Sequence, residues 1–142
     1  MLKVLVAVDG STQAQHAIDM ARRLHGETKG METVLLHVRH WPVFLGDLPP
    51  ARYEDVEREQ IHHQEGLLAQ ALAAARRAGL AAVTTAAAVG EPAPEIARTA
   101  KEKGIDLIVM GTHGRGAVGS LVVGSVAQRV VHLAEVPVVL VK

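Results

Sequence analysis

The stretch IDLIVMGTHGRGAVGSLVVGS, Ile105–Ser125, joins one of the most apolar runs of the chain to a glycine-rich segment. A short continuous apolar run is typical of a strand that is covered on both faces. Glycine loses more conformational freedom on folding than any other residue, so a cluster of glycines indicates that the backbone itself has a task. The stretch therefore predicts a buried strand followed by a loop with accessible backbone groups.

Strand-like and helix-like patterns alternate on both sides of this stretch. The apolar runs are Lys3–Val8, Thr33–Val38, Ala81–Val89, Asp106–Gly111 and Val136–Val141, of which the alanine-rich third is the weakest. Helical periodicity occupies Gln13–His25, Ala51–Ala78, Glu91–Lys103 and about Ser120–Ala134. This alternation indicates βαβ units with right-handed crossovers. We therefore predict one α/β domain over residues 1–142, an open five-stranded parallel sheet with helices on both faces, doubly wound in the Rossmann-like manner.

Composition argues against several classes of protein. The 142 residues include 15 Lys plus Arg and 15 Asp plus Glu, a neutral balance that disfavours a general nucleic-acid binder. The absence of cysteine excludes disulfides and thiolate metal sites. The apolar run near the N-terminus is too short for a signal peptide or a membrane span. We expect a soluble, cytoplasmic protein with neither nucleic-acid nor membrane partners.

Polar residues and glycines follow the first and fourth predicted strands. In doubly wound sheets, ligands bind at the carboxyl ends of strands, where the strand order reverses. In the common 2-1-3-4-5 winding, early and late strands become neighbours at the centre. Asp9 and the loop from Gly111 are therefore expected to face one crevice.

The glycine loop has the chemistry of a phosphate site. Successive glycine N–H groups form anion-binding concavities, and the N-terminus of the following helix adds positive potential. Ser125 offers a hydroxyl group, and Arg115 offers a guanidinium group. The alternative is a tight turn in which glycines permit close packing of helix and sheet. The loop glycines are Gly111, Gly114, Gly116, Gly119 and Gly124.

The spacing Gly111-x2-Gly114-x9-Gly124-Ser125 resembles the nucleotide loop of the universal stress protein family, G-2x-G-9x-G-(S/T). The segments VAVDGS, LLHV and VPVVLVK also resemble that family, and the likeness covers essentially the whole chain. It implies a stand-alone domain with the fold called adenine nucleotide alpha hydrolase-like. The intact loop is similar to that of the family members that bind ATP.

The resemblance implies a role for each matching position. Asp9 would contact the ribose or metal-bound phosphates, which makes it an indirect contact of Mg²⁺, and Val38 would meet the adenine edge through its backbone. Met110 and Gly111 would line the ribose side. The phosphates would be met by Gly114, Arg115, Gly124, Ser125 and Val126. The expected cofactors are ATP and Mg²⁺.

Three functions remain open at this point. The first is an ATP-binding regulatory protein of the stress response. The second is a slow ATP hydrolase or phosphotransfer enzyme that uses Asp9 and His113, although one carboxylate is a thin metal site and dedicated catalysis is not indicated. The third is an interaction protein whose loop stays empty. We expect His113 to face solvent and His37 to be satisfied by backbone groups.

The last predicted strand, VPVVLV, is expected at an edge of the sheet. A long apolar edge invites pairing with another chain, and the resemblance implies a homodimer formed by antiparallel pairing of this strand. Shielding by a neighbouring helix is the alternative. The segment Arg39–Tyr53 is expected to be a loop that leads into the long second helix and packs on its own domain.

Overall fold

The computed structural model describes residues 1–41, 49–113 and 123–142, in which strands and helices alternate. The elements are β1 Leu2–Ala7, α1 Thr12–Glu27, β2 Met31–Arg39, α2 Pro50–Arg77, β3 Val83–Val89, α3 Pro92–Glu102, β4 Leu107–Gly111, α4 Ser125–Leu133 and β5 Val138–Val141. All five predicted strands are present. The predicted start of the fourth helix, about Ser120, is wrong, because Gly124 has the extended backbone of an N-cap and the helix begins at Ser125. Residues 42–48 of the expected loop Arg39–Tyr53 lie outside the described residues, and its last residues, from Pro50, belong to α2.

The sheet is parallel, with the strand order β3-β2-β1-β4-β5. This confirms the predicted five-stranded α/β architecture, but the 2-1-3-4-5 winding is wrong. The chain moves outward from β1 through β2 to β3, then crosses to the other side of β1 for β4 and β5. The order reverses between β1 and β4, which are neighbours in the sheet. The residues at their carboxyl ends, Asp9 and those from Gly111, therefore still lie at one edge of the sheet, as predicted.

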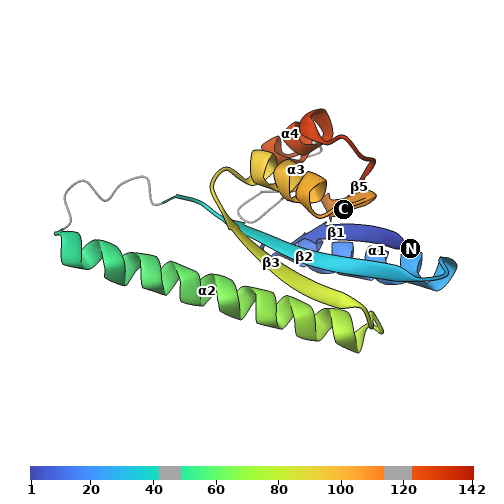
Figure 1. Cartoon of the computed structure of the whole chain (residues 1–142), viewed down its shortest axis with the longest axis horizontal. Helices are drawn as coiled ribbons and strands as arrows, with labels where there is room; N and C mark the ends of the chain where they lie inside the picture. The colour runs from blue at the N-terminus through green and yellow to red at the C-terminus, as the bar shows by residue number, and fades with distance from the viewer. Residues whose placement is uncertain (42–48, 114–122) are drawn as a thin grey trace.

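In the described part of the chain, α1 and α2 cover one face of the sheet, and α3 and α4 cover the other (Figure 1). One apolar cluster joins α1 and α2 to the sheet through side chains such as Ile18, Leu35 and Leu68. The other joins α3 and α4 through side chains such as Leu36, Ile96 and Val130. Adjacent residues Leu35 and Leu36 thus enter opposite clusters, as the pleat of a strand requires. Burial on both faces explains why the strands are continuous apolar runs.

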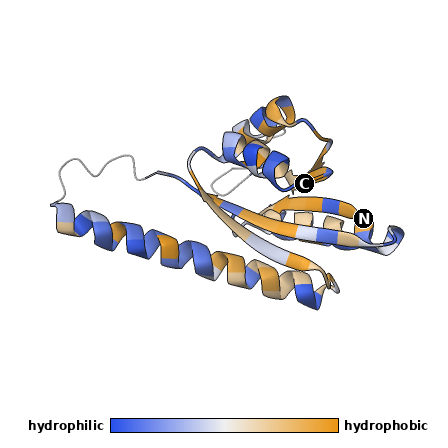
Figure 2. Cartoon of the chain, in the orientation of Figure 1, coloured by the Kyte–Doolittle hydropathy of each residue, from blue (hydrophilic) through white to orange (hydrophobic). Residues whose placement is uncertain are grey.

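Helix α2 is buried only along its second half. Its buried residues run from Gln64 to Ala75, whereas the helix begins at Pro50. Figure 2 shows the first half as largely hydrophilic and extending beyond the sheet. No helix among the described residues has the length and apolarity needed to cross a membrane.

The first part of β2 contains a buried hydroxyl group without a hydrogen-bond partner among the described atoms. Thr33 is 1% exposed, and its Oγ1 is unpaired among the described atoms. The change Thr33→Val keeps the shape and removes this cost, so we expect the free energy of unfolding to rise by about 1 kcal/mol in urea denaturation. Thr85→Val, on the exposed edge strand β3, is the control and should change stability by less than about 0.5 kcal/mol. An unchanged or reduced stability of the Thr33 variant would contradict this account.

Candidate functional site

A cleft of about 540 Å³ lies at the carboxyl ends of β1, β2 and β4, at the point where the strand order reverses. This volume is in the range of small-molecule sites. Seven of the nine predicted site residues line it: Asp9, Val38, Met110, Gly111, Gly124, Ser125 and Val126. Gly114 and Arg115 lie outside the described residues, as do Gly116 and Gly119.

The turn after β1 holds Asp9 at the cleft. Asp9 Oδ1 accepts a hydrogen bond from the Ser11 N–H at 2.9 Å, and Ser11 Oγ in turn accepts from the Ala14 N–H at 3.1 Å. Ser11 is therefore the N-cap of α1. Gly10 has a φ of +82°, a conformation that lets the chain reverse between strand and helix. The sequence VDGS thus encodes both the turn and the position of the carboxylate.

The junction of β4 and α4 is unusually close. The Gly124 N–H donates to the Thr112 carbonyl oxygen at 2.7 Å, and the Thr112 N–H donates to the Val141 carbonyl oxygen at 2.9 Å. A Cβ atom at Gly124 would lie 2.9 Å from the Thr112 carbonyl oxygen, closer than van der Waals contact allows. Close packing is thus one reason for this glycine, and the same packing brings the start of α4 to the cleft.

The start of α4 presents backbone donors to the cleft. Gly124 is the N-cap and has no side chain with which to bond the first-turn N–H groups. Ser125 and Val126, the first two helical residues, are exposed and line the cleft. N–H groups at a helix N-terminus, together with the helix dipole, favour an anion.

Gln13, which sequence analysis missed, supports this junction from α1. Its Oε1 accepts from the His113 N–H at 2.7 Å and lies 3.4 Å from Thr112 Oγ1. A Cβ atom at Gly111 would lie 2.9 Å from Gln13 Cβ, so the glycine makes room for the glutamine. Nothing in the sequence pattern distinguishes this residue from other polar residues of the helix.

Several histidines also line the cleft, namely His37, His40, His63 and His113. The expectation of a solvent-facing His113 is wrong, because it is half-buried in the cleft wall with Nδ1 3.1 Å from Thr112 Oγ1. The expectation for His37 is also wrong, because its ring nitrogen is bonded by the Gln64 side chain. Burial lowers the pKa of His37, and the nearby Asp9 carboxylate partly opposes that effect.

Metal binding has limited support from the protein itself. Among the described residues, no group of three or more histidine or carboxylate side chains is arranged to hold a metal ion. Asp9 is the acidic residue among those that line the described cleft. One carboxylate suits Mg²⁺ that is held mainly by substrate phosphates and water.

Comparison with known proteins gives consistent results over the whole chain. The family model described as "Universal stress protein family" matches residues 1–142. Universal stress protein YxiE of Bacillus subtilis (strain 168) is 38% identical over 148 residues, covering 99% of this chain and 98% of that protein. The structure of universal stress protein UspA from Lactobacillus plantarum has a TM-score of 0.85 at 23% identity, covering 99% and 97% of the two chains, and shows the same fold.

A further solved structure contains a nucleotide. The universal stress protein from Archaeoglobus fulgidus, in complex with dAMP, is 25% identical with a TM-score of 0.72. The alignment covers 100% of this chain and 98% of that one. An adenine nucleotide is therefore a ligand of a protein that matches this chain from end to end.

The support from Gln13 can be tested by removing its amide. Gln13→Ala deletes the acceptor of the His113 N–H, and we expect a loss of about 1–2 kcal/mol in the free energy of unfolding. Gln15→Ala, exposed on the same helix, is the matched control and should stay within about 0.5 kcal/mol of the unmodified protein. Equal stabilities of the two variants would show that the bond from Gln13 contributes nothing.

Proposed function

The chain belongs to the universal stress protein family, and on this premise we propose that it is an ATP-binding regulatory protein of the stress response. The observation that carries the proposal is the start of α4, which has no side-chain cap. It is held against the end of β4 and lines a cleft of about 540 Å³. The dAMP complex of the Archaeoglobus fulgidus relative supports an adenine nucleotide as the ligand. ATP with Mg²⁺ is the form we propose.

The base would bind at the end of β2. The Val8 N–H donates to the Leu36 carbonyl oxygen, and Leu36 is the last residue of β2 that pairs with β1. Backbone groups alternate in direction along a strand, so those of Val38 point to the same side as those of Leu36 but beyond the end of β1. One donor and one acceptor thus extend toward the cleft that Val38 lines. Such a pair can read the amino group and ring nitrogen of adenine.

The phosphates would bind at the start of α4. Ser125 and Val126 would supply N–H groups and the Ser125 hydroxyl group, while Gly124, whose N–H donates to the Thr112 carbonyl oxygen, would hold the start of the helix at the cleft. Gly114 and Arg115 would complete the contacts, with the guanidinium group offsetting phosphate charge. Met110 and Gly111, at the end of β4 between the two sides, would face the ribose. Asp9 would act on Mg²⁺ indirectly, because phosphate oxygens supply most ligands of such an ion.

Gly124 provides the test of nucleotide binding. In Gly124→Ala the new Cβ atom clashes with the Thr112 carbonyl oxygen and displaces α4, so we expect the affinity for ATP with Mg²⁺ to fall at least about tenfold. Isothermal titration calorimetry with ATP, ADP and AMP, each with and without Mg²⁺, measures the effect and identifies the preferred nucleotide. Gly26→Ala, where an added Cβ meets nothing within 4 Å, is the control. Unaltered affinity in the Gly124 variant would refute the phosphate site.

We also propose that the protein forms a homodimer through β5, an edge strand of the sheet. The Pro137 carbonyl oxygen accepts from Ile108 of β4, and the Val141 carbonyl oxygen accepts from Thr112, the residue after β4. The backbone groups of Val138 and Leu140 therefore point away from the sheet. All four residues of β5 remain half-buried. Unpaired backbone groups beside partly exposed apolar side chains favour pairing with a second copy.

The dimer is tested by removing one outward N–H group. Leu140→Pro spares the bonds to β4 but deletes a donor at the open edge, so we expect a dimer-to-monomer shift in analytical ultracentrifugation. The matched control is Thr85→Pro on β3, the strand at the opposite edge. The backbone groups of Ala82 and Gly90 bond to β2, so those of odd-numbered residues such as Thr85 point away from the sheet. If Leu140→Pro remains a dimer, or if Thr85→Pro dissociates to the same extent, the interface does not lie at β5.

A further inference from the structure

Gln64 is a buried polar side chain within an otherwise apolar contact surface of α2. It is 5% exposed, and the other buried residues of the helix are Leu68, Ala71 and Ala75. Its Nε2 lies 3.1 Å from the His37 carbonyl oxygen and 3.0 Å from the Ala88 carbonyl oxygen. Val38 pairs with Ala88, so this amide joins the ends of β2 and β3 beside the residue proposed to read the base.

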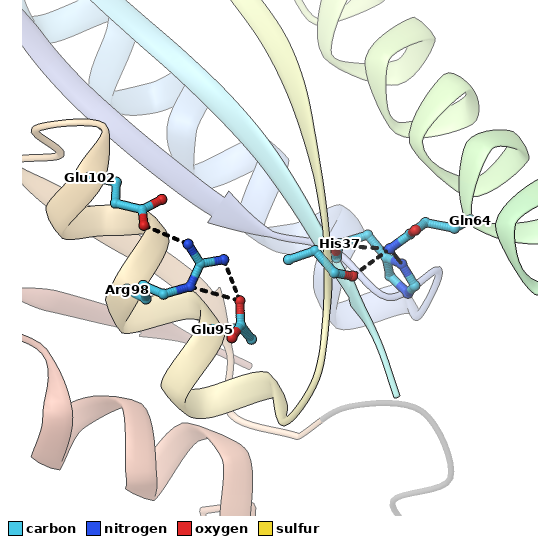
Figure 3. A network of polar contacts seen from close by, with 6 residues as sticks. His37, Gln64, Glu95, Arg98 and Glu102 are labelled. Carbon is cyan, nitrogen blue, oxygen red and sulfur yellow. Dashed lines mark hydrogen bonds and ion pairs between the residues drawn. The ribbon is translucent and has the colours of Figure 1, made fainter. Parts of the chain in front are cut away.

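The same amide contacts the His37 ring and determines which ring nitrogen carries the proton (Figure 3). Carbonyl oxygens only accept hydrogen bonds, so the group that faces the His37 and Ala88 carbonyls must be the amino group of Gln64. This amino group is also 2.9 Å from His37 Nδ1. An amide nitrogen does not accept hydrogen bonds, so Nδ1 is the acceptor, and the two N–H donors are shared among the three acceptors. The ring is then a neutral imidazole that carries its proton on Nε2.

The surroundings of His37 influence its charge in both directions. Burial is the main effect that lowers its pKa, and His63 of α2 and His40 beyond β2 lower it further. Asp9, at the end of β1, raises it. Arg39, which pairs with Glu57 at 3.6 Å, and Glu59 line the adjoining groove between β2 and α2.

We propose that Gln64 and His37 form a proton-sensitive clamp that positions the base-binding side of the cleft. A proton on His37 Nδ1 would place an N–H donor of the ring opposite the N–H donors of Gln64. The Gln64 amino group would then move away from the His37 and Ala88 carbonyl oxygens. The ends of β2 and β3 would then separate more readily, and the backbone of Val38 would lose its position. Gln64 is thus a positioning residue, and its effect on the ligand rests on the nucleotide function proposed above.

The sign of the pH effect follows from the direction of the pKa shift. His37 titrates below its ordinary value of 6.5 in the folded protein. Well above pH 6.5 neither the folded nor the unfolded chain holds this proton, and the clamp is intact. As the pH falls below 6.5, the unfolded or opened state binds a proton that the closed state resists, so the clamp weakens.

Hydrogen exchange at the Gly90 amide tests the clamp without nucleotide. The Gly90 N–H donates to the Arg39 carbonyl oxygen at 2.9 Å, at the strand ends beside Gln64. We expect Gln64→Met to lower its protection factor about tenfold at neutral pH, whereas Gln70→Met, exposed on the same helix, leaves it unchanged. The amides at the centre of β2 should keep their protection in both variants, which separates local opening from unfolding.

The proton dependence is tested with His37→Asn. The asparagine oxygen supplies an acceptor where Nδ1 lies, but it does not titrate. We expect Gly90 protection to fall between pH 7 and pH 5 in the unmodified protein and to stay level in this variant. Imidazole nitrogen chemical shifts should show the Nε2–H tautomer at neutral pH. An Nδ1–H tautomer, or equal pH profiles for the two proteins, would overturn the clamp.

Adenosine binding tests the positioning role. Adenosine is uncharged, so protonation of other histidines affects its binding less than that of ATP. We expect its affinity to fall about tenfold in Gln64→Met, and in the unmodified protein between pH 7 and pH 5. Altered Gly90 protection with constant adenosine affinity would overturn the positioning role. If the unmodified protein binds neither adenosine nor ATP at neutral pH, the nucleotide function fails while Gly90 exchange still decides on the clamp.

Discussion

The hydrogen bond from the Gly124 N–H to the Thr112 carbonyl oxygen is the constraint on which the site depends, because it fixes the start of α4 against the end of β4. Thr112 also donates to Val141, so the same residue ties β5 to this junction. A side chain at position 124 would collide with the backbone. One close backbone approach therefore positions both the start of α4, where we propose that phosphate binds, and the end of the edge strand.

The parallel sheet explains why these groups converge. Parallel strands place their carboxyl ends at one edge, and the reversal of order between β1 and β4 leaves a gap there that no crossover helix fills in the described part of the chain. β2 continues past the last pair that it forms with β1, so its backbone groups reach this gap. The cleft is thus a consequence of strand length and strand order, and side chains only refine it.

Much of this arrangement was predictable from local patterns. Continuous apolar runs located the five strands, and the glycine spacing located the α4 junction, because both features are encoded by neighbouring residues. The strand order was not predictable in the same way, since strands buried on both faces have similar composition wherever they lie in the sheet. The Gln13 and Gln64 contacts were missed because each joins positions far apart in the chain, 100 residues apart for Gln13 and His113. A single polar residue on a helix carries no periodic signal of its partner.

Gln13 and Gln64 support opposite sides of the cleft, one through its amide oxygen and the other through its amide nitrogen. Gln13 uses its carbonyl oxygen to accept the His113 N–H, whereas Gln64 uses its amino group to donate to two strand carbonyls. A carboxylate in place of Gln13 would meet the same N–H but would repel a phosphate nearby, and a lysine in place of Gln64 would bring a charge into a buried site. An amide satisfies the backbone at either end without adding net charge. Within the described cleft, the charge that can change close to the strand ends is that of His37, whose Nδ1 contacts Gln64.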